Sequence, residues 1–588
     1  MEDLTLRYYD AEMRYLREAA KEFAQAHPDR AAMLDLDKAG IPDPYVERLF
    51  EGFAFSMGRL RAKIDDHLPE FTEGLMSLLW PHYLRTIPSL SIVELLPDTD
   101  VLKMSERINA GFGVLSQPVG PKKTVCQYRT TQPVTLSPLS VTAVNIDAEP
   151  DGRSVIRMRI KCNPQMDWSQ TELTRLSLYL SGDAPVTHAL HLALTKRLAS
   201  LYLRLPNSVE RIRLEGYFSP GGFADEDSLW PKGDTAFGGW QLLLEYFTFR
   251  EKFMFVHLNG LEKITFPAGI DCFEIEAVLT QQWNSELPVG SENIRLHCVP
   301  VINLFTLEAD PLVVNGLESE YLLRPRRLQD GHMEIYSVDA VSGSQRARNA
   351  VYAPFTSFRH KGGMMRRNAP ERYYHTRVRR GVSGLYDTWL ILGGDAWERD
   401  RLAEYETVSL KVTGTNGQLP RRALQSSLLN RCEQILQTPL AVRNLCKPTL
   451  PAYPPAEDRF HWRVLSHLGS SFLNMMASAE VLKGTLSLYN WQDDELNYRR
   501  LDAIMDVQQH EIQRFEKGFL LRGVDIEITL DENGFTGEGD IHLFGEMLNR
   551  FFALYADIHL FNQLTVIIQP AGKSLRWKEN HNQRLPGC

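Results

Sequence analysis

Two short motifs contain residue types that bind phosphate or act as nucleophiles. Residues 572–574 (Gly-Lys-Ser) match the end of a phosphate-binding loop, but Ile567 stands where that loop needs its first glycine, and Pro570 removes a backbone amide that should bind phosphate. Ser383 lies among glycines, yet Leu385 stands where a nucleophile elbow needs its second glycine. Neither segment therefore predicts a catalytic or cofactor-binding site.

Metal-ligand residue types occur in three places. His188 and His191 share one helical face, and His297 adjoins Cys298, but neither pair has a third ligand at metal-site spacing, so structural histidines are predicted. The acidic, glycine-rich stretch Asp531–Asp540 lacks the spacing of a calcium loop and is interpreted as solvated hairpin carboxylates. We therefore expect no metal, no cofactor and no enzyme activity, and the lack of a catalytic constellation favours an assembly role.

One charged cluster stands out in the window 351–380. It contains Phe355, Phe358, Tyr373 and Tyr374, a composition typical of a single-strand-binding groove. A solvated loop or a docking patch for an acidic protein surface are the alternatives, and the acidic chain favours them over nucleic acid. Against one acid, Glu371, the window has eight basic residues: Arg359, Lys361, Arg366, Arg367, Arg372, Arg377, Arg379 and Arg380.

Length and composition indicate a large globular chain. Its 588 residues are enough for several cores, and 65 Lys and Arg against 74 Asp and Glu give a net charge of −9. Seven scattered cysteines without a CxxC pair indicate reduced thiols and a cytoplasmic location. The acidic N-terminus lacks a signal-peptide pattern, and no apolar run is long enough for a spanning helix, so neither export nor direct membrane insertion is predicted.

The first part of the chain carries apolar residues at helical spacing. Such a stripe normally faces the protein's own core, and the sequence favours this interpretation. The alternative is that these heptad-like helices pair with helices of other subunits. A third helix is predicted between Pro69 and Trp80. The two stripes comprise Leu6, Tyr9, Met13, Leu16, Ala20 and Phe23, then Val46, Phe50, Phe53, Met57, Leu60 and Ile64.

From Ile87 the period changes to two, which predicts half-buried strands. Apolar residues alternate with polar ones around 156–161, 176–180 and 408–412, and a helix is predicted with Val186, Leu190, Leu194, Leu198 and Leu201 on one face. Near the end, Val524, Ile526, Ile528 and Leu530 alternate with Asp525, Glu527, Thr529 and Asp531. Those outward carboxylates are predicted to meet water or a polar partner, and a helix around 543–555 is predicted to cover the apolar face.

The predicted fold class is a mixed α+β, multidomain chain. We divide it into an N-terminal helical segment (1–86), a β-rich body of one or two subdomains (87–420) and a C-terminal α/β domain (421–588).

Several separated motifs resemble the TssF family, also called ImpG or VasA. They lie at both ends and in the middle of the chain: Arg7–Tyr9, Tyr15–Glu18, Asp43–Leu49, Ile64–Asp66, Pro81–Arg85, Leu243–Phe247, Pro300–Phe305, Arg522–Glu532, Leu543–Gly545 and Phe551–Tyr555.

The resemblance implies a structural subunit of the type VI secretion baseplate, without catalysis. Two copies would join one TssG to form a wedge that recruits TssK trimers and TssE. Six wedges would surround the VgrG spike and inner tube beneath the contractile sheath, docked on the inner-membrane complex, and the family is similar to wedge proteins of contractile phage baseplates. No nucleic-acid partner is implied.

Residues on four segments are therefore the candidate partner contacts. The outward carboxylates are expected to pair with a basic patch on a neighbouring subunit, such as residues 359–380. The candidates are Leu6, Tyr9, Met13, Leu16, Phe23, Phe50, Phe53, Met57, Asp525, Glu527, Arg377, Arg379 and Arg380.

Overall fold

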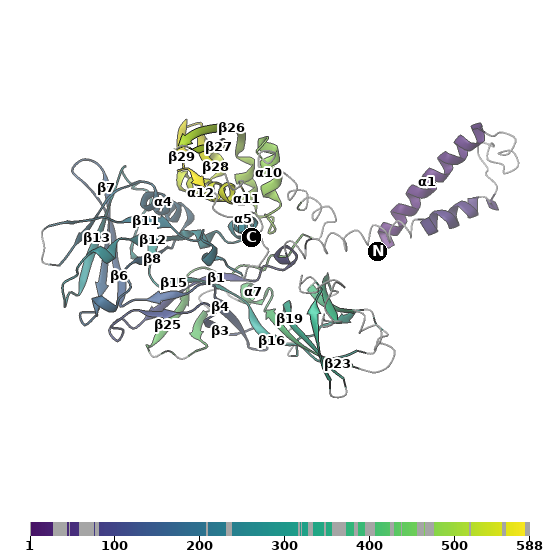
Figure 1. Ribbon diagram of the computed structural model, residues 1–588, viewed down its shortest axis with the longest axis horizontal. Helices are drawn as coiled ribbons and strands as arrows, with labels where there is room; N and C mark the ends of the chain where they lie inside the picture. The colour runs from purple at the N-terminus through teal and green to yellow at the C-terminus, as the bar shows by residue number, and fades with distance from the viewer. Residues whose placement is uncertain are drawn as a thin grey trace. The chain divides into compact units, whose positions relative to one another are not determined.

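The structure is a computed structural model, and it confirms a mixed α and β chain in which strands predominate (Figure 1). Two compact units divide the chain: Met1–Leu79 with Ala456–Ser466, and Trp80–Pro455 with His467–Cys588. The described residues are 2–26, 44–45, 47–57, 76, 81–206, 210–230, 238–314, 318, 320–326, 333–345, 348–355, 372–381, 386–393, 406–423, 429–434, 436, 438–455, 464, 476–516, 519–555 and 560–581.

The smaller unit contains the two predicted N-terminal helices. α1 spans Glu2–Ala26, a stretch without Pro or Gly that opens with two acidic residues. Acidic residues suit a helix N-terminus because they face the positive end of the helix dipole. Residues 47–57 form the second helix, and an ion pair of 2.8 Å joins Arg17 to Glu47. The predicted third helix, 69–80, lies outside the described residues except for one helical position at Met76.

The larger unit begins with a six-stranded antiparallel sheet. Val93, Val114 and Tyr128 are fully buried in its core. β24 and β25 join this sheet after the chain has formed three further sheets of four or more strands. A boundary at residue 420 falls between them and the strands that they pair with. The strand order is β24 (Leu429–Cys432), β3 (Gly113–Val119), β4 (Thr124–Thr130), β15 (Cys298–Ile302), β1 (Leu90–Pro97) and β25 (Leu440–Asn444).

Two further sheets complete the first half of the body. The predicted alternation is confirmed on β7, where Ile156, Met158 and Ile160 are buried. On β8 it is wrong at one position, because Tyr179 is buried together with Leu178 and Leu180. One sheet has the order β10 (Ile212–Leu214), β9 (Leu198–Arg204), β13 (Cys272–Leu279), β7 (Ser154–Cys162) and β6 (Leu139–Ala148). The other has the order β11 (Tyr217–Pro220), β12 (Phe255–Asn259), β8 (Arg175–Leu180) and β14 (Ile294–Arg295), and β2 (Glu106–Ile108) pairs separately with β5 (Val134–Leu136).

An eight-stranded sheet carries the basic window. On its strand β23, Val408, Leu410 and Val412 are buried and alternate with exposed residues, as predicted. The strand order is β16 (Phe305–Glu308), β23 (Glu406–Thr415), β19 (Glu334–Gln345), β20 (Arg348–Pro354), β21 (Tyr373–Arg380), β22 (Tyr386–Gly393) and β18 (Tyr321–Leu322), with β17 (Leu312–Val314) also pairing β23.

The helices of the larger unit are short apart from α12. One prediction is wrong: Leu198 and Leu201 do not continue the helix of Val186, because α4 ends at Thr195 and both leucines lie on β9. Spacings of three and four fit this segment, but β9 pairs with β13 and β10, and that pairing decides its structure. The helices are α4 (Ala184–Thr195), α5 (Gly238–Thr248), α7 (Leu419–Ala423), α10 (Ala479–Ser487), α11 (Glu495–Asp502) and α12 (Glu538–Tyr555). Short 3-10 helices span Pro81–Leu84, Trp168–Gln170, Asp225–Asp227, Arg250–Met254, Leu261–Lys263, Ser291–Asn293 and Glu532–Gly534.

The C-terminal sheet contains a parallel β-α-β unit. β27 (Phe519–Asp531) pairs antiparallel with β26 (Ile504–Glu516) and parallel with β28 (Leu560–Gln569), and α12 connects the parallel pair. β29 (Lys573–Arg576) and β30 (Asn580–His581) pair with the other side of β28. The predicted strand over 524–531 and the predicted helix over 543–555 are both confirmed.

α12 also joins this sheet to the body. It packs against β28 on one side and against α4 and α5 on the other (Figure 1). The approach is close, because a Cβ added to Gly539 would lie 2.2 Å from the carbonyl oxygen of His188. Only glycine fits the first turn of α12 at this contact.

A buried carboxylate lies at the same junction. Asp540 is fully buried and accepts hydrogen bonds from Arg250 and from Arg500, the latter at 3.1 Å. The backbone and hydroxyl of Thr536 donate to it as well, each at 3.2 Å. Burial acts to raise the pKa of Asp540, but Arg250, His188 and Arg500 together hold it well below its ordinary value.

The acidic stretch before α12 therefore differs from our interpretation. Asp531 accepts from the backbone N–H of Asn533 at 3.0 Å, which caps the short helix Glu532–Gly534. Asp540 is not a solvated hairpin carboxylate, because its two arginine partners come from parts of the chain that the local sequence does not reveal.

Replacing Asp540 tests how much this junction contributes to the free energy of unfolding. Asp540→Ala leaves Arg250 and Arg500 buried without their acid, so we expect the free energy of unfolding to fall by about 3–5 kcal/mol. Urea unfolding followed by tryptophan fluorescence measures it. Glu532→Gln, at an exposed position eight residues earlier, is the control and should change stability by less than about 0.5 kcal/mol. Equal unfolding midpoints for Asp540→Ala and the control would contradict this role.

Candidate functional site

The two N-terminal helices bury only part of their predicted stripes. Met13 is 7% exposed, and Tyr9, Leu16, Phe50 and Met57 are half-buried. Phe23 and Phe53 are exposed, and the side chain of Leu6 lies outside the described residues. The centre of the first stripe therefore packs inside the unit, whereas the second helix keeps apolar side chains at the surface.

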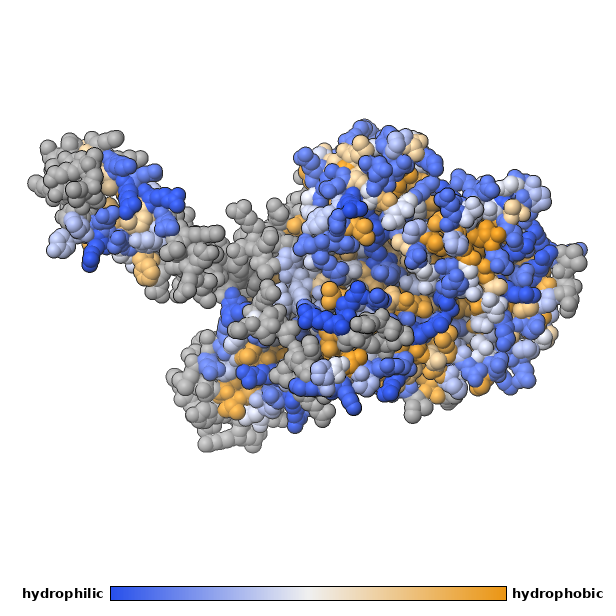
Figure 2. All heavy atoms as spheres, turned by 180° about the vertical axis from the view of Figure 1, so that it is seen from behind, coloured by the Kyte–Doolittle hydropathy of each residue, from blue (hydrophilic) through white to orange (hydrophobic). Residues whose placement is uncertain are grey.

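The second helix carries a row of exposed apolar residues, of which only Phe53 belongs to the predicted stripe. Tyr45, Leu49 and Phe53 are spaced by four residues and are 85%, 72% and 53% exposed. Residues spaced by four share one helix face, so these side chains lie along one side. Figure 2 shows pale orange residues between blue ones on these helices. The sequence contains the pattern that identifies this row, because Tyr45, Leu49 and Phe53 are spaced by four residues. Tyr45 lies one residue before Val46, where the predicted stripe begins.

The predicted carboxylates lie on the open face of the C-terminal sheet. Asp525 and Glu527 occupy alternate positions of β27, opposite Gln563 and Thr565 of β28, and both are half-buried. Asp525 lines a hollow of about 670 Å³ on this face. Its Oδ1 is buried and accepts no hydrogen bond from any described residue. This confirms that the carboxylates point away from α12, but Asp525 is less exposed than a solvated face would make it.

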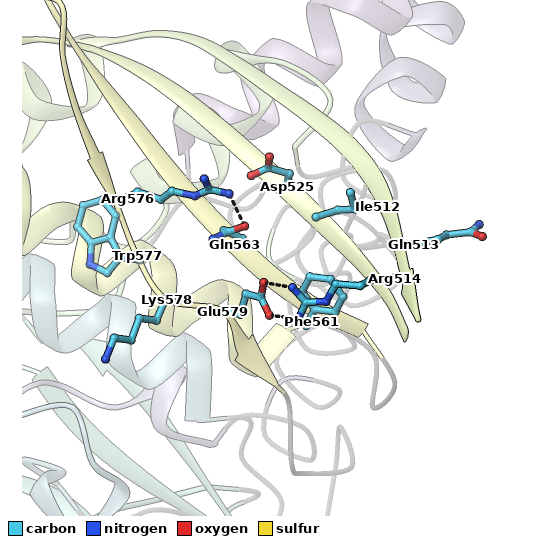
Figure 3. A pocket seen from close by; sticks show the side chains of 10 residues that line it. All are labelled: Ile512, Gln513, Arg514, Asp525, Phe561, Gln563, Arg576, Trp577, Lys578 and Glu579. Atoms are coloured by element: carbon cyan, nitrogen blue, oxygen red, sulfur yellow. Dashed lines mark hydrogen bonds and ion pairs between the residues drawn. The ribbon is translucent and has the colours of Figure 1, made fainter. Parts of the chain in front are cut away.

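The other charged groups of the hollow contact each other. Arg514 of β26 forms a two-pronged ion pair with Glu579, at 2.8 and 2.6 Å, and its guanidinium lies over the ring of Phe561 (Figure 3). A Cβ on Gly523 of β27 would lie 2.4 Å from that ring, so only glycine at this position leaves room for the ring of Phe561. Arg576 donates to Gln563 at 2.7 Å.

Three arginines of the basic window contact acids of their own chain. Arg372 donates to buried Glu406 at 2.9 Å. Arg379 forms two bonds to Glu320, at 2.6 and 3.0 Å, and Arg377 lies 3.7 Å from the same carboxylate. The described part of the window is therefore an ion-paired sheet face and not an open cationic groove.

The other basic residues of the window lie outside the part of the chain that the structure describes. Residues 356–371, which contain Arg359, Lys361, Arg366 and Arg367, lie outside the described residues, as does the side chain of Arg380. Residues 382–385 of the glycine-flanked serine segment also lie outside them.

The histidines are buried structural groups. His188 contacts Thr536 at 3.2 Å, and His191 lies on α4 facing His542 of α12, with ring centres 6.1 Å apart. Burial lowers the pKa of His188 to about 4, of His191 to about 3 and of His542 to about 4. His297 contacts Ser137 at 2.9 Å. Within the described ranges, no three ligand-type side chains gather in a way that could hold a metal ion.

None of the helices that the structure describes combines the length and the apolar character needed to cross a membrane.

Comparisons with known proteins agree along the whole chain. The family model "Type VI secretion system, TssF" matches residues 1–584. The type VI secretion system component TssF1 of Pseudomonas aeruginosa is 29% identical over 98% of this chain and 99% of that protein.

Two solved structures are more similar. A chain of a TssK-TssF-TssG baseplate subcomplex of the type VI secretion system is 70% identical, covers 92% of this chain and 100% of its own, and has a TM-score of 0.82. A chain of a type VI secretion baseplate complex is 69% identical over 99% of this chain and 100% of its own, with a TM-score of 0.67.

These matches define the class as a structural subunit of a type VI secretion baseplate. The chain belongs to the TssF family.

The buried histidines predict a loss of stability in mild acid. Their pKa values in the folded chain lie below the ordinary value near 6.5, so below that pH the unfolded chain binds protons that the folded chain does not. Stability should fall as the pH drops from about 6.5 to about 4, by about 2–3 kcal/mol per histidine. Urea midpoints at pH 7 and pH 4.5 measure the fall.

Two substitutions test whether the buried histidines cause this loss of stability in acid. His191→Gln should reduce the difference between the two pH values, and His510→Gln, at an exposed position of β26, should not. A pH dependence that is the same in both variants would contradict the assignment.

Proposed function

We propose that the chain forms a wedge of the baseplate together with a second copy of itself and one TssG subunit. The wedge recruits TssK and TssE, and six wedges surround the VgrG spike beneath the contractile sheath, docked on the inner-membrane complex. The cytoplasmic location predicted from the sequence is part of this proposal.

One observation carries the proposal. The chain shares 70% identity, over almost its whole length, with a chain from a TssK-TssF-TssG subcomplex. The partners of that assembly are therefore the partners to test first.

The exposed row of the second helix supports an assembly role. Tyr45, Leu49 and Phe53 form a stripe of apolar surface on the smaller unit, whose buried residues in the described part are Met13, Ala54, Met76 and Val464. Contiguous exposed apolar surface of this kind is typical of a protein interface. A partner helix that covered this row would gain about 1.5–3 kcal/mol of binding free energy for each large side chain that it buries.

Co-expression tests the wedge. The chain should elute with TssG and TssK of the same secretion system in size-exclusion chromatography, and a second copy should be present in the complex. Expressed alone, it should aggregate or self-associate through its apolar row. A well-behaved lone monomer that never elutes with these subunits would overturn the proposal.

Substitution of the exposed row separates assembly from folding. Leu49→Ser with Phe53→Ser should change the melting temperature of the isolated chain little, because both side chains are more than half exposed. Binding to the partner subunits should weaken at least tenfold. Met13→Ser is the matched control, since its side chain is buried and the change should lower stability. Normal assembly by the double variant would show that this row is only solvated.

The alternative of single-stranded nucleic-acid binding gains no support from the described part of the window. There, Arg372, Arg377 and Arg379 contact Glu406 and Glu320, so these three cations are already paired within the chain.

A further inference from the structure

The eight-stranded sheet is joined to the rest of the larger unit, here called the body, at one end. All of its strands come from residues 305–415, so the chain enters it once, at β16, and leaves it once, after β23. The entry and the exit lie side by side, because Phe305 pairs with Gly414. Two adjacent chain crossings form an axis about which a domain can turn. We call this sheet the arm, and the two crossings, 303–304 and 416–418, the pivot.

A buried amide network fixes the pivot. Asn303 is fully buried, and its side-chain nitrogen donates to the backbone oxygen of Gln127 at 2.7 Å and to Asn416 Oδ1 at 2.9 Å. Its Oδ1 accepts from the hydroxyl of Thr415 at 2.8 Å and from the backbone N–H of Asn416 at 2.7 Å. The amide therefore makes all four of its hydrogen bonds, and separating the two crossings would leave buried polar groups unpaired.

A second set of contacts holds the arm outside the pivot. Tyr453, which follows β25 and belongs to the body, places its hydroxyl 2.8 and 2.9 Å from the two carboxylate oxygens of Glu334 on the arm. Its ring stacks on that of Tyr386, also on the arm, with ring centres 4.3 Å apart. Arg85 of the body lies over the ring of Tyr336 of the arm, 5.5 Å from its centre. In contrast to the pivot amide, the two partners from the body are only half-buried.

The second set of contacts is the easier one to open. Half-buried rings and a half-buried guanidinium are already partly hydrated, so water replaces their partners as they separate. Glu334 is buried, and no cation of the described residues pairs with it. Burial raises the pKa of Glu334, so contact with water would stabilise its charged form. Opening at Tyr453 therefore exposes a group that water solvates well.

The base of the arm also has room to shift. A hollow of about 570 Å³ lies beside the pivot. Arg129 and Trp230 line it from the body, and Phe305, Thr306 and Thr413 line it from the arm. No described side chain fills this hollow, so a small turn of the arm toward it meets no packed core.

We propose that the eight-stranded sheet is a movable arm that turns about Asn303 and Asn416, and that Tyr453 is the stop that holds it. When Tyr453 leaves Glu334 and Tyr386, the arm takes further directions while the amide network of the pivot stays intact. The crossing after β23 contains Gly417 at a φ of 54°, a left-handed conformation that glycine adopts without strain. The inference goes beyond the proposed function, because it concerns a motion of the single chain and needs no assembled complex.

Single-molecule FRET measures the direction of the arm. Dyes on p-acetylphenylalanine in place of Val101 in the body and Val351 in the arm report the distance between them. These positions are 52% and 73% exposed, so the labels remove little packing. The full chain is observed at concentrations too low for self-association. The wild-type chain should give one dominant FRET efficiency, and Tyr453→Ala should add a second population at a different efficiency.

Further variants separate the stop from the pivot. Tyr453→Phe keeps the ring and loses the hydroxyl, so its second population should be smaller than that of Tyr453→Ala. Tyr217→Ala, at a body position that is 61% exposed, is the matched control and should keep one population. Asn303→Ala should instead lower the midpoint of urea unfolding, because it leaves buried partners without their hydrogen bonds.

Two results would overturn the inference. One is a single, unchanged FRET efficiency in both Tyr453 variants, and the other is the same second population in Tyr217→Ala. If Tyr453→Ala does not fold, as judged by circular dichroism, Tyr453→Phe decides alone, and an unchanged efficiency in that variant overturns the inference equally.

Discussion

The buried carboxylate of Asp540 is the interaction on which the arrangement of the larger unit depends. It lies in the first turn of α12, and its arginine partners come from the short helix after α5 and from α11. Three separate segments therefore meet at one charge. A buried acid is stable only when its partners are complete, so the charge can exist only in the packed arrangement. The close contact of Gly539 with α4 acts together with it, because any side chain there would separate the helices before the ion pairs formed.

This junction determines what the C-terminal sheet can present. α12 lies between β28 and the helices α4 and α5, so one face of the sheet is covered. Ile526, Ile528 and Leu564 are fully buried on that face. Strand alternation then directs Asp525 and Glu527 to the opposite face. The two acid sites differ for this reason. Asp540 is completed by its own chain and stabilises the fold, whereas Asp525 on the open face keeps a buried Oδ1 atom without a hydrogen bond from any described residue.

Sequence periodicity predicted the elements that bury one face locally, and it failed where the deciding contacts are distant. Alternation identified β7, β23 and β27, and helical spacing identified α1 and α12. The same spacing misplaced Leu198 and Leu201, because pairing with β13 cannot be read from the segment itself. The outward direction of Asp525 followed from strand parity alone. The pairing of Arg377 and Arg379 with Glu320 and the burial of Asp540 could not be predicted, since the partners lie in segments with no local relation to them.

The two kinds of surface in this chain suit different parts of an assembly. An apolar row such as Tyr45, Leu49 and Phe53 gains free energy from any apolar partner, because the hydrophobic effect has no direction. It supplies affinity but does not fix the register of one helix against another. A charged surface is the opposite, since repulsion and desolvation exclude most partners. Apolar area therefore sets how tightly a partner is held, and charge sets which partner is accepted.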